Sequence, residues 1–252
     1  MAIVALLVLG VFGIPVVSAV SSAGALYHTV SATSSTNWAG FAVTGAKGSV
    51  SDVQGSWIVP SIQGSCPRTN QYSSFWVGID GFNSRSVEQT GTDSDCQGGS
   101  PTYYAWYEFY PKPSVGISLS ISPGDTMFAE VKHTSSGFTA TIKDVTTGKS
   151  FTKSVRVSAA RSSAEWIAEA PSSSSGILPL ADFGTIKFGT DATGVASTCT
   201  ATVSASTGAV GSFSNIHAIT MVNTAGTQHK ANPTALSSDR TSFNVTWVSA
   251  GP

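Results

Sequence analysis

Two glutamates in the segment RSSAEWIAEAP (161–171) are the first candidates for chemistry in this chain. Glu165 and Glu169 are four residues apart, while the whole sequence of 252 residues holds only 14 aspartates and glutamates. In an extended strand the side chains alternate between faces, so both glutamates and the intervening Ile167 would share one face. The segment therefore indicates either a solvated stripe on a strand or carboxylates placed to transfer protons.

Two aromatic segments predict a surface on which such carboxylates would have partners. The segment FWVGID (75–80) places Trp76, Gly78 and Asp80 on one face, opposite the apolar side chains of Phe75, Val77 and Ile79. The segment YYAWYEFYP (103–111) places four polar-tipped side chains on one face, namely Tyr104, Trp106, Glu108 and Tyr110. If these strands are neighbours, one sheet surface collects Trp, Tyr, Glu and Asp, which is typical of a binding groove rather than a core.

Other familiar catalytic arrangements are absent from the sequence. There is no G-x-S-x-G elbow, no H-E-x-x-H helix and no C-x-x-C pair, so neither a metal nor another cofactor is expected. The Asp-Thr/Ser-Gly signature of pepsin-like proteases is also missing, because Met127 follows Asp125-Thr126. The histidines lie in contexts that indicate surface or packing roles: His28, His133, His217 and His229.

The composition favours strands and turns. Only 11% of residues are charged and the formal net charge is −1, which excludes nucleic acid as an expected partner. Short alternating segments follow one another from Asn37 onward, separated by turns such as 123–125 and 147–149. No long stretch has the period of a helix. We expect an all-β protein, a β-sandwich or barrel in a single domain over 37–252.

The amino-terminal residues predict export. Residues 2–17 are apolar and end at Ser18-Ala19, which indicates a signal peptide over 1–19, with a single-span anchor as the alternative because the run is shorter than a membrane span. Residues 20–36 are expected to form a flexible leader. A secreted chain with no stable membrane association after cleavage follows, and its setting permits disulfides. Cys66 and Cys96 are the expected pair, while Cys199 stays unpaired or pairs differently.

Six motifs occur in an order that resembles the glutamic peptidases, also called eqolisins or family G1. They are NWAGFAV (37–43), GSWIVPS (55–61), SFWVGIDG (74–81), EQTGTD (88–93), YYAWYEFYP (103–111) and AEWIAE (164–169). The resemblance covers nearly the whole chain from Asn37. It implies a secreted, monomeric endopeptidase that cuts protein or peptide substrates in acid. It also implies a sandwich of two large antiparallel sheets with a concave substrate cleft.

The same resemblance implies which side chains act. The catalytic glutamine and glutamate of the family fall on Gln89 and Glu169, so that Glu165 is left as a rim charge or substrate contact. The residues expected to line the cleft and bind substrate are Trp38, Trp76, Asp80, Trp106, Glu108 and Tyr110. Family members often carry an aspartate where this chain has Tyr104.

Peptide hydrolysis gives Glu169 and Gln89 complementary tasks. Near pH 3–4 a histidine is a cation, whereas a glutamate with an ordinary pKa of ~4.3 still titrates in that range and can accept the proton of a water. The neutral amide of Gln89 can donate to the oxyanion at any working pH. Glu108 is expected to hydrogen-bond Gln89 or substrate. Gly91, on the face of Gln89, is expected to let a substrate backbone approach.

Three alternatives remain open from the sequence. An aromatic groove on a sandwich also stacks sugar rings, so a carbohydrate-binding module is possible. A glycosidase would use Glu108 and Glu169 as its carboxylate pair, although Gln89 would then have no role. A third alternative is an inactive relative of the peptidases.

Overall fold

The fold is known from a computed structural model that describes residues 28–251. The expected signal peptide (1–19) and the first part of the expected leader lie outside the described residues. The bounds of the strands are β1 Ser31–Ser35, β2 Trp38–Thr44, β3 Val50–Ile58, β4 Ser74–Ile79, β5 Glu88–Gln97, β6 Ser100–Phe109, β7 Val115–Ile117, β8 Thr126–Thr134, β9 Gly137–Asp144, β10 Ser150–Val155, β11 Ser163–Glu169, β12 Ser172–Ser173, β13 Gly176–Ile177, β14 Thr185–Phe188, β15 Thr200–Val203, β16 Ser206–Ala209, β17 Ile216–Val222, β18 His229–Pro233 and β19 Phe243–Trp247. The helical elements in these residues are two short turns, α1 Thr190–Thr193 and η1 Val210–Ser212. The prediction of an all-β fold is therefore confirmed.

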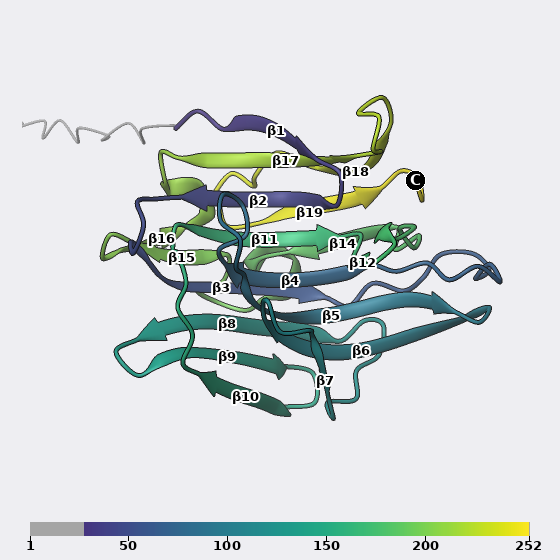
Figure 1. Cartoon of the computed structure of the whole chain (residues 1–252), viewed down its shortest axis with the longest axis horizontal. Helices are drawn as coiled ribbons and strands as arrows, with labels where there is room; N and C mark the ends of the chain where they lie inside the picture. Colours follow the sequence, from purple (N-terminus) through teal and green to yellow (C-terminus); the bar gives the residue numbers. More distant parts are fainter. Residues whose placement is uncertain (1–27, 252) are drawn as a thin grey trace, which may run out of the picture.

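Two large sheets form the sandwich. The first has the order β1-β17-β2-β11-β4-β5-β6-β7, in which every pairing is antiparallel except that of β1 with β17 (Figure 1). The second contains β10-β9-β8-β3 and continues through β15-β16 and through β14-β19-β18. Pairing of β18 with β17 joins the two sheets along one edge.

The main core lies between the sheets. The alternation expected for 75–80 is confirmed, because Phe75, Val77 and Ile79 of β4 are fully buried in this core. They are in one hydrophobic cluster with Trp57 of β3 and with apolar residues of β8 and β9. The opposite face of the first sheet consequently presents the other residues of β4, β5, β6 and β11, and these build the site.

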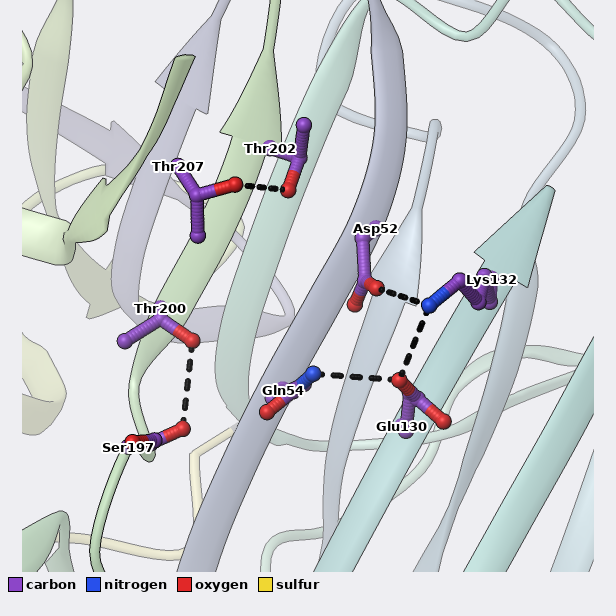
Figure 2. Close-up of polar contacts among 8 residues, drawn as sticks. All are labelled: Asp52, Gln54, Glu130, Lys132, Ser197, Thr200, Thr202 and Thr207. Carbon is purple, nitrogen blue, oxygen red and sulfur yellow. Dashed lines mark hydrogen bonds and ion pairs between the residues drawn. The ribbon is translucent and has the colours of Figure 1, made fainter. Parts of the chain in front are cut away.

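The outward face of the second sheet carries polar ladders instead of apolar side chains. Lys132 lies 3.2 Å from Asp52 and 3.8 Å from Glu130, and Gln54 donates to Glu130 at 3.0 Å (Figure 2). On the neighbouring strands, hydroxyl pairs continue this pattern across β15 and β16, as in the 2.7 Å contact of Thr202 with Thr207.

One expectation about the amino-terminal part is wrong. Residues 31–35, which composition placed in a flexible leader, form strand β1 and pair in parallel with β17 from Ser31↔His217 to Ser35↔Met221. The small polar side chains of this segment conceal the strand, because its hydrogen bonds are made by the backbone and its side chains stay largely exposed. Among residues 28–251, no helix has the length and apolar character needed to cross a membrane.

The expected disulfide between Cys66 and Cys96 is present, while Cys199 is buried and unpaired. The bridge ties the loop before β4 to the carboxyl end of β5. It therefore holds together the two strands that bring Trp76 and Gln89 to the site.

Candidate active site

A cleft of ≈ 330 Å³ opens on the face of the first sheet that points away from the core. Gln89 of β5, Glu108 of β6 and Glu169 of β11 all line it, although they are far apart in the sequence. The antiparallel register explains this, because β4 lies between β11 and β5 and pairs with both of them. In the described part of the chain no cluster of three or more His, Cys, Asp or Glu is arranged to hold a metal ion.

Glu169 is held at both oxygens of its carboxylate. The side-chain amide of Asn37 donates to Oε1 at 3.0 Å, and the indole N–H of Trp76 donates to Oε2 at 2.8 Å. Burial in the cleft raises the pKa of Glu169 to about 7 and the charge of Glu108 adds to the increase, whereas the side chains of Trp76, Trp38 and Asn37 act to lower it. The carboxyl group is therefore fixed in place and a stronger base than an exposed glutamate.

Gln89 is paired with Glu108, which is one of the two contacts that the sequence left open for Glu108. The register places the two residues directly opposite each other, and Nε2 of Gln89 donates to Oε2 of Glu108 at 2.5 Å. Burial raises the pKa of Glu108, whereas the hydrogen bond from Gln89 acts to lower it. The amide of Gln89 keeps its second N–H for another acceptor. Its Oε1 is buried with no protein partner in the part of the chain that the structure describes.

Three residues of the cleft lining and the buried Asp95 form a hydrogen-bond network that the sequence did not predict. Asp93 accepts from the indole N–H of Trp106 at 2.5 Å and from the hydroxyl of Tyr104 at 2.7 Å. The same hydroxyl lies 3.1 Å from Asp95. Burial and the charge of Asp95 raise the pKa of Asp93 to about 8, and burial raises that of Asp95 to about 6. The available signal was the last residue of EQTGTD, since alternation places Asp93 on the face of Gln89.

The aromatic residues divide between lining the cleft and supporting it. Trp38, Trp106 and Tyr110 line the cleft, and Tyr110 is 48% exposed. Trp76 differs from expectation, because it is fully buried and contacts Glu169 through its N–H instead of offering a surface to substrate. Trp38 packs edge-to-face on Trp76 with ring centroids 5.0 Å apart.

The expectation that Asp80 binds substrate is not supported by its position. Asp80 is fully buried and accepts hydrogen bonds from the backbone N–H groups of Arg161 and Ser162, at 2.6 and 2.8 Å. Alternation placed it on the face of Trp76, but the strand ends at Ile79 and Asp80 takes a positive φ of 75°. Its carboxylate consequently fixes the residues that lead into β11.

Glu165 is not a rim residue either. It shares the face of Glu169, as alternation predicts, but β11 is flanked by β2 and β4, and Glu165 pairs with Ala42 and Gly78. It is fully buried, and burial together with the charges of Asp80 and Glu88 raises its pKa well above the usual range. The two glutamates of one segment therefore have different surroundings.

Gly91 does not open the cleft to a substrate. A Cβ at this position would lie 2.2 Å from the carbonyl oxygen of Phe75 and 2.6 Å from Cβ of Trp76. The missing side chain instead allows the neighbouring strand β4 to approach β5 closely.

Comparison with known proteins agrees with this architecture, a two-sheet antiparallel sandwich whose cleft is lined by a glutamine and a glutamate. Residues 36–246 match the Peptidase A4 family, the family of the eqolisins or G1 peptidases, and the chain belongs to that family. The match gives no support to the carbohydrate-binding and glycosidase alternatives.

Two curated relatives are similar in sequence. The chain is 33% identical to aspergillopepsin-2 of Aspergillus niger over 61% of its own length, and 37% identical to scytalidopepsin B of Scytalidium lignicola over 55%. The alignments span 62% and 53% of these two relatives, so the chain spans less than two thirds of either.

Solved structures are similar over more of the chain. Scytalido-glutamic peptidase, solved with a peptide-based transition state analog, matches 86% of this chain and 100% of its own with a TM-score of 0.68 and 26% identity. Aspergilloglutamic peptidase from Aspergillus niger matches 71% of this chain and 99% of its own with a TM-score of 0.57 and 30% identity.

The contact of Asn37 and the raised pKa values of the buried carboxyls could not be predicted, for different reasons. Asn37 stands beside Trp38 in the first motif, but an asparagine before a strand is ordinarily a turn residue, and only the fold brings it to Glu169. The raised pKa values were missed because an aspartate or glutamate is expected in solvent unless the strand pairing is known.

Proposed function

We propose that the protein is an endopeptidase that hydrolyses peptide bonds with Glu169 as general base and Gln89 as oxyanion donor. The observation that carries this proposal is that both residues line one cleft, each held by a neighbour, in a member of a peptidase family. Relatives of similar fold bind peptide-like molecules, one a transition state analog and another the tripeptide Ala-Ile-His.

The proposed reaction uses a water molecule as the nucleophile. The ionised carboxylate of Glu169 takes a proton from the water, and the oxygen of the water bonds to the peptide carbonyl carbon. The N–H of Gln89 that does not contact Glu108 donates to the oxyanion, a contribution of roughly 2.7–4 kcal/mol in comparable sites. Protonated Glu169 then gives its proton to the leaving nitrogen as the C–N bond breaks. The carboxylate is thereby regenerated.

The raised pKa of Glu169 changes the pH range expected from the sequence. A base with an ordinary pKa of ~4.3 would be ionised in part at pH 3–4. With its pKa raised to about 7, the ionised fraction of Glu169 falls about tenfold for each pH unit below that value. We therefore expect the acid limb of the activity profile to lie at a higher pH than a glutamate with an ordinary pKa would give.

Two substitutions test the assignment. Glu169→Gln removes the base and should lower kcat/KM by at least about 10³, and Gln89→Ala removes one oxyanion donor and should lower kcat by about 10²–10³. Cleavage of a quenched fluorescent peptide measures both, with thermal unfolding as the check that each variant is folded. A folded Glu169→Gln variant with most of its activity would overturn the proposal. Full activity of the unsubstituted protein at pH 3 would instead show that the pKa of Glu169 is not raised to about 7.

We also propose that the protein acts outside the cell as a monomer on extended polypeptides. The supporting observations are the apolar run at 2–17, the disulfide between Cys66 and Cys96, and a cleft open along one sheet face. Sequencing the amino terminus of the protein recovered from culture medium tests export. An intact Met1 on a cell-bound chain would contradict it.

A further inference from the structure

We propose that Ser35 and Asn37 form a positioning relay that fixes the carboxylate of Glu169 from the amino-terminal strand β1. This inference rests on the proposed function, because it concerns the geometry of the proposed base. Ser35 Oγ donates to Oδ1 of Asn37 at 3.0 Å, and Nδ2 of Asn37 donates to Oε1 of Glu169 at 3.0 Å.

The serine determines which end of the asparagine side chain meets Glu169. A carboxamide has an accepting oxygen and a donating nitrogen, and only the nitrogen stabilises a carboxylate. Ser35 Oγ also accepts from the backbone N–H groups of Asn37 at 3.3 Å and Trp38 at 3.2 Å. Its own proton is therefore directed to Oδ1 of Asn37, and this contact leaves Nδ2 facing Glu169.

Asn37 complements Trp76 on the other oxygen of the same carboxylate. With Oε1 fixed by Asn37 and Oε2 by Trp76, the plane of the carboxylate is set. A base must be held within a fraction of an ångström of its productive position to act efficiently, and two donors at opposite ends accomplish this. Asn37 and Ser35 act through Glu169 and are positioning residues, not catalytic ones.

The relay links the site to the edge of the sheet. Among the described strands, β1 pairs only with β17, and the two strands run parallel. The residues of β1 are exposed or half-buried. The backbone of Asn37 is tied separately to β11, because its carbonyl accepts from the N–H of Ala170 at 2.8 Å. Loss of the Ser35 hydroxyl should consequently reorient the side chain of Asn37 while its backbone stays in place.

Other titratable groups line the same cleft as Glu169, and the charge of Glu108 acts on its ionisation in the opposite sense to the Asn37 donor. Glu108 comes from β6, Asp93 from β5, and the tyrosines that line the cleft are Tyr72, Tyr104 and Tyr110. On the strands adjacent to β11, the residues paired with Glu169 are Trp38 and Ser74, which carry no charge. Removing the charge of Glu108 should favour ionisation of Glu169, whereas removing the Asn37 donor should oppose it.

The experiment measures the pH profile of kcat/KM with one fluorescent peptide for Ser35→Ala and Asn37→Ala. Asn37→Ala should move the acid limb upward by about one pH unit, since a hydrogen bond to a charged group is lost. Ser35→Ala should move the acid limb in the same direction by less. Ser35→Thr keeps the hydroxyl, so its acid limb should equal that of the unsubstituted protein. Ser31→Ala is the matched control, because Ser31 is exposed at the far end of β1, and its profile should equal that of the unsubstituted protein. Glu108→Gln should move the limb downward.

Three outcomes would overturn the relay. One is an unchanged acid limb in Ser35→Ala with an unfolding midpoint equal to that of the control. The second is an equal loss of activity at all pH values, which indicates a purely structural role. The third is a pH profile of Ser35→Thr that matches that of Ser35→Ala and not that of the unsubstituted protein. If Asn37→Ala does not fold, the comparison of Ser35→Ala with Ser35→Thr decides alone. Retention of activity by Glu169→Gln would instead refute the proposed function, so the two failures are distinguishable.

Discussion

Replacing Glu88 with glutamine should make the protein more stable at neutral pH and leave it nearly unchanged in acid. Glu88 is fully buried, and neither carboxyl oxygen has a hydrogen-bond partner among the described residues. Burial, aided by the charge of Asp80, raises its pKa to about 8. The folded protein therefore holds a proton that the unfolded chain releases above about pH 4.5.

The sign and size of the effect follow from this difference. The folded state binds a proton that the unfolded chain has released. The free energy of unfolding is therefore highest below the unfolded pKa of Glu88 and falls as the pH rises toward 8. At pH 7, roughly 2.5 pH units above the ordinary pKa, the loss is about 3 kcal/mol at ~1.36 kcal/mol per unit. Glutamine has nearly the same shape and no charge, so Glu88→Gln should remove this loss.

Urea unfolding followed by tryptophan fluorescence measures the free energy of unfolding at pH 4, 5.5 and 7. The gap between Glu88→Gln and the unsubstituted protein should grow from near zero at pH 4 to about 3 kcal/mol at pH 7. Asp191→Asn serves as the control for the loss of one carboxylate at an exposed position. A gap of the same size at pH 4 and pH 7 would refute the reasoning, since Glu88 would then keep its charge in the folded state.

Three further substitutions test other parts of the structure. Tyr104→Phe removes the hydroxyl that donates to Asp95, whose pKa of about 6 leaves it ionised at pH 7, so the variant should lose about 1 kcal/mol more at pH 7 than at pH 4; equal losses at both would contradict this. Gly91→Ala should lower the free energy of unfolding by at least about 2 kcal/mol, because a Cβ there would lie 2.2 Å from the backbone of β4. An unchanged free energy of unfolding in urea would show that the strands can separate. Reducing the bond between Cys66 and Cys96 releases a loop of 30 residues and should cost about 3 kcal/mol, measured by thermal unfolding with and without reductant.

The faces of the strands could be predicted because they depend only on alternation along the chain. The residues of 103–111 divide between core and cleft as that rule requires, Phe75, Val77 and Ile79 face the core, and Glu108 lies beside Gln89. The same rule placed Glu165 and Glu169 on one face correctly. It could not give their exposure, which depends on which strands lie on either side.

The amino-terminal strand and the buried carboxyls could not be predicted from local sequence. β1 is composed of serine, alanine and threonine, and its formation depends on β17, almost two hundred residues away in the chain. Asp80 changed role because the strand ended one residue before it. In each case the deciding information is a contact between distant segments, for which a single sequence carries no direct signal.

The hydroxyl ladders on the outer face of the second sheet have a consequence for behaviour in solution. Threonine and serine do not ionise in the working range, so pairs such as Thr202 with Thr207 present the same surface at pH 4 as at pH 7. Glu88, Asp93 and Glu165, whose pKa values are raised by burial, have almost no exposed surface. The hydroxyl ladders should therefore keep the same hydrogen-bonding surface between pH 4 and pH 7, while protonation of the buried carboxyls changes the stability of the fold.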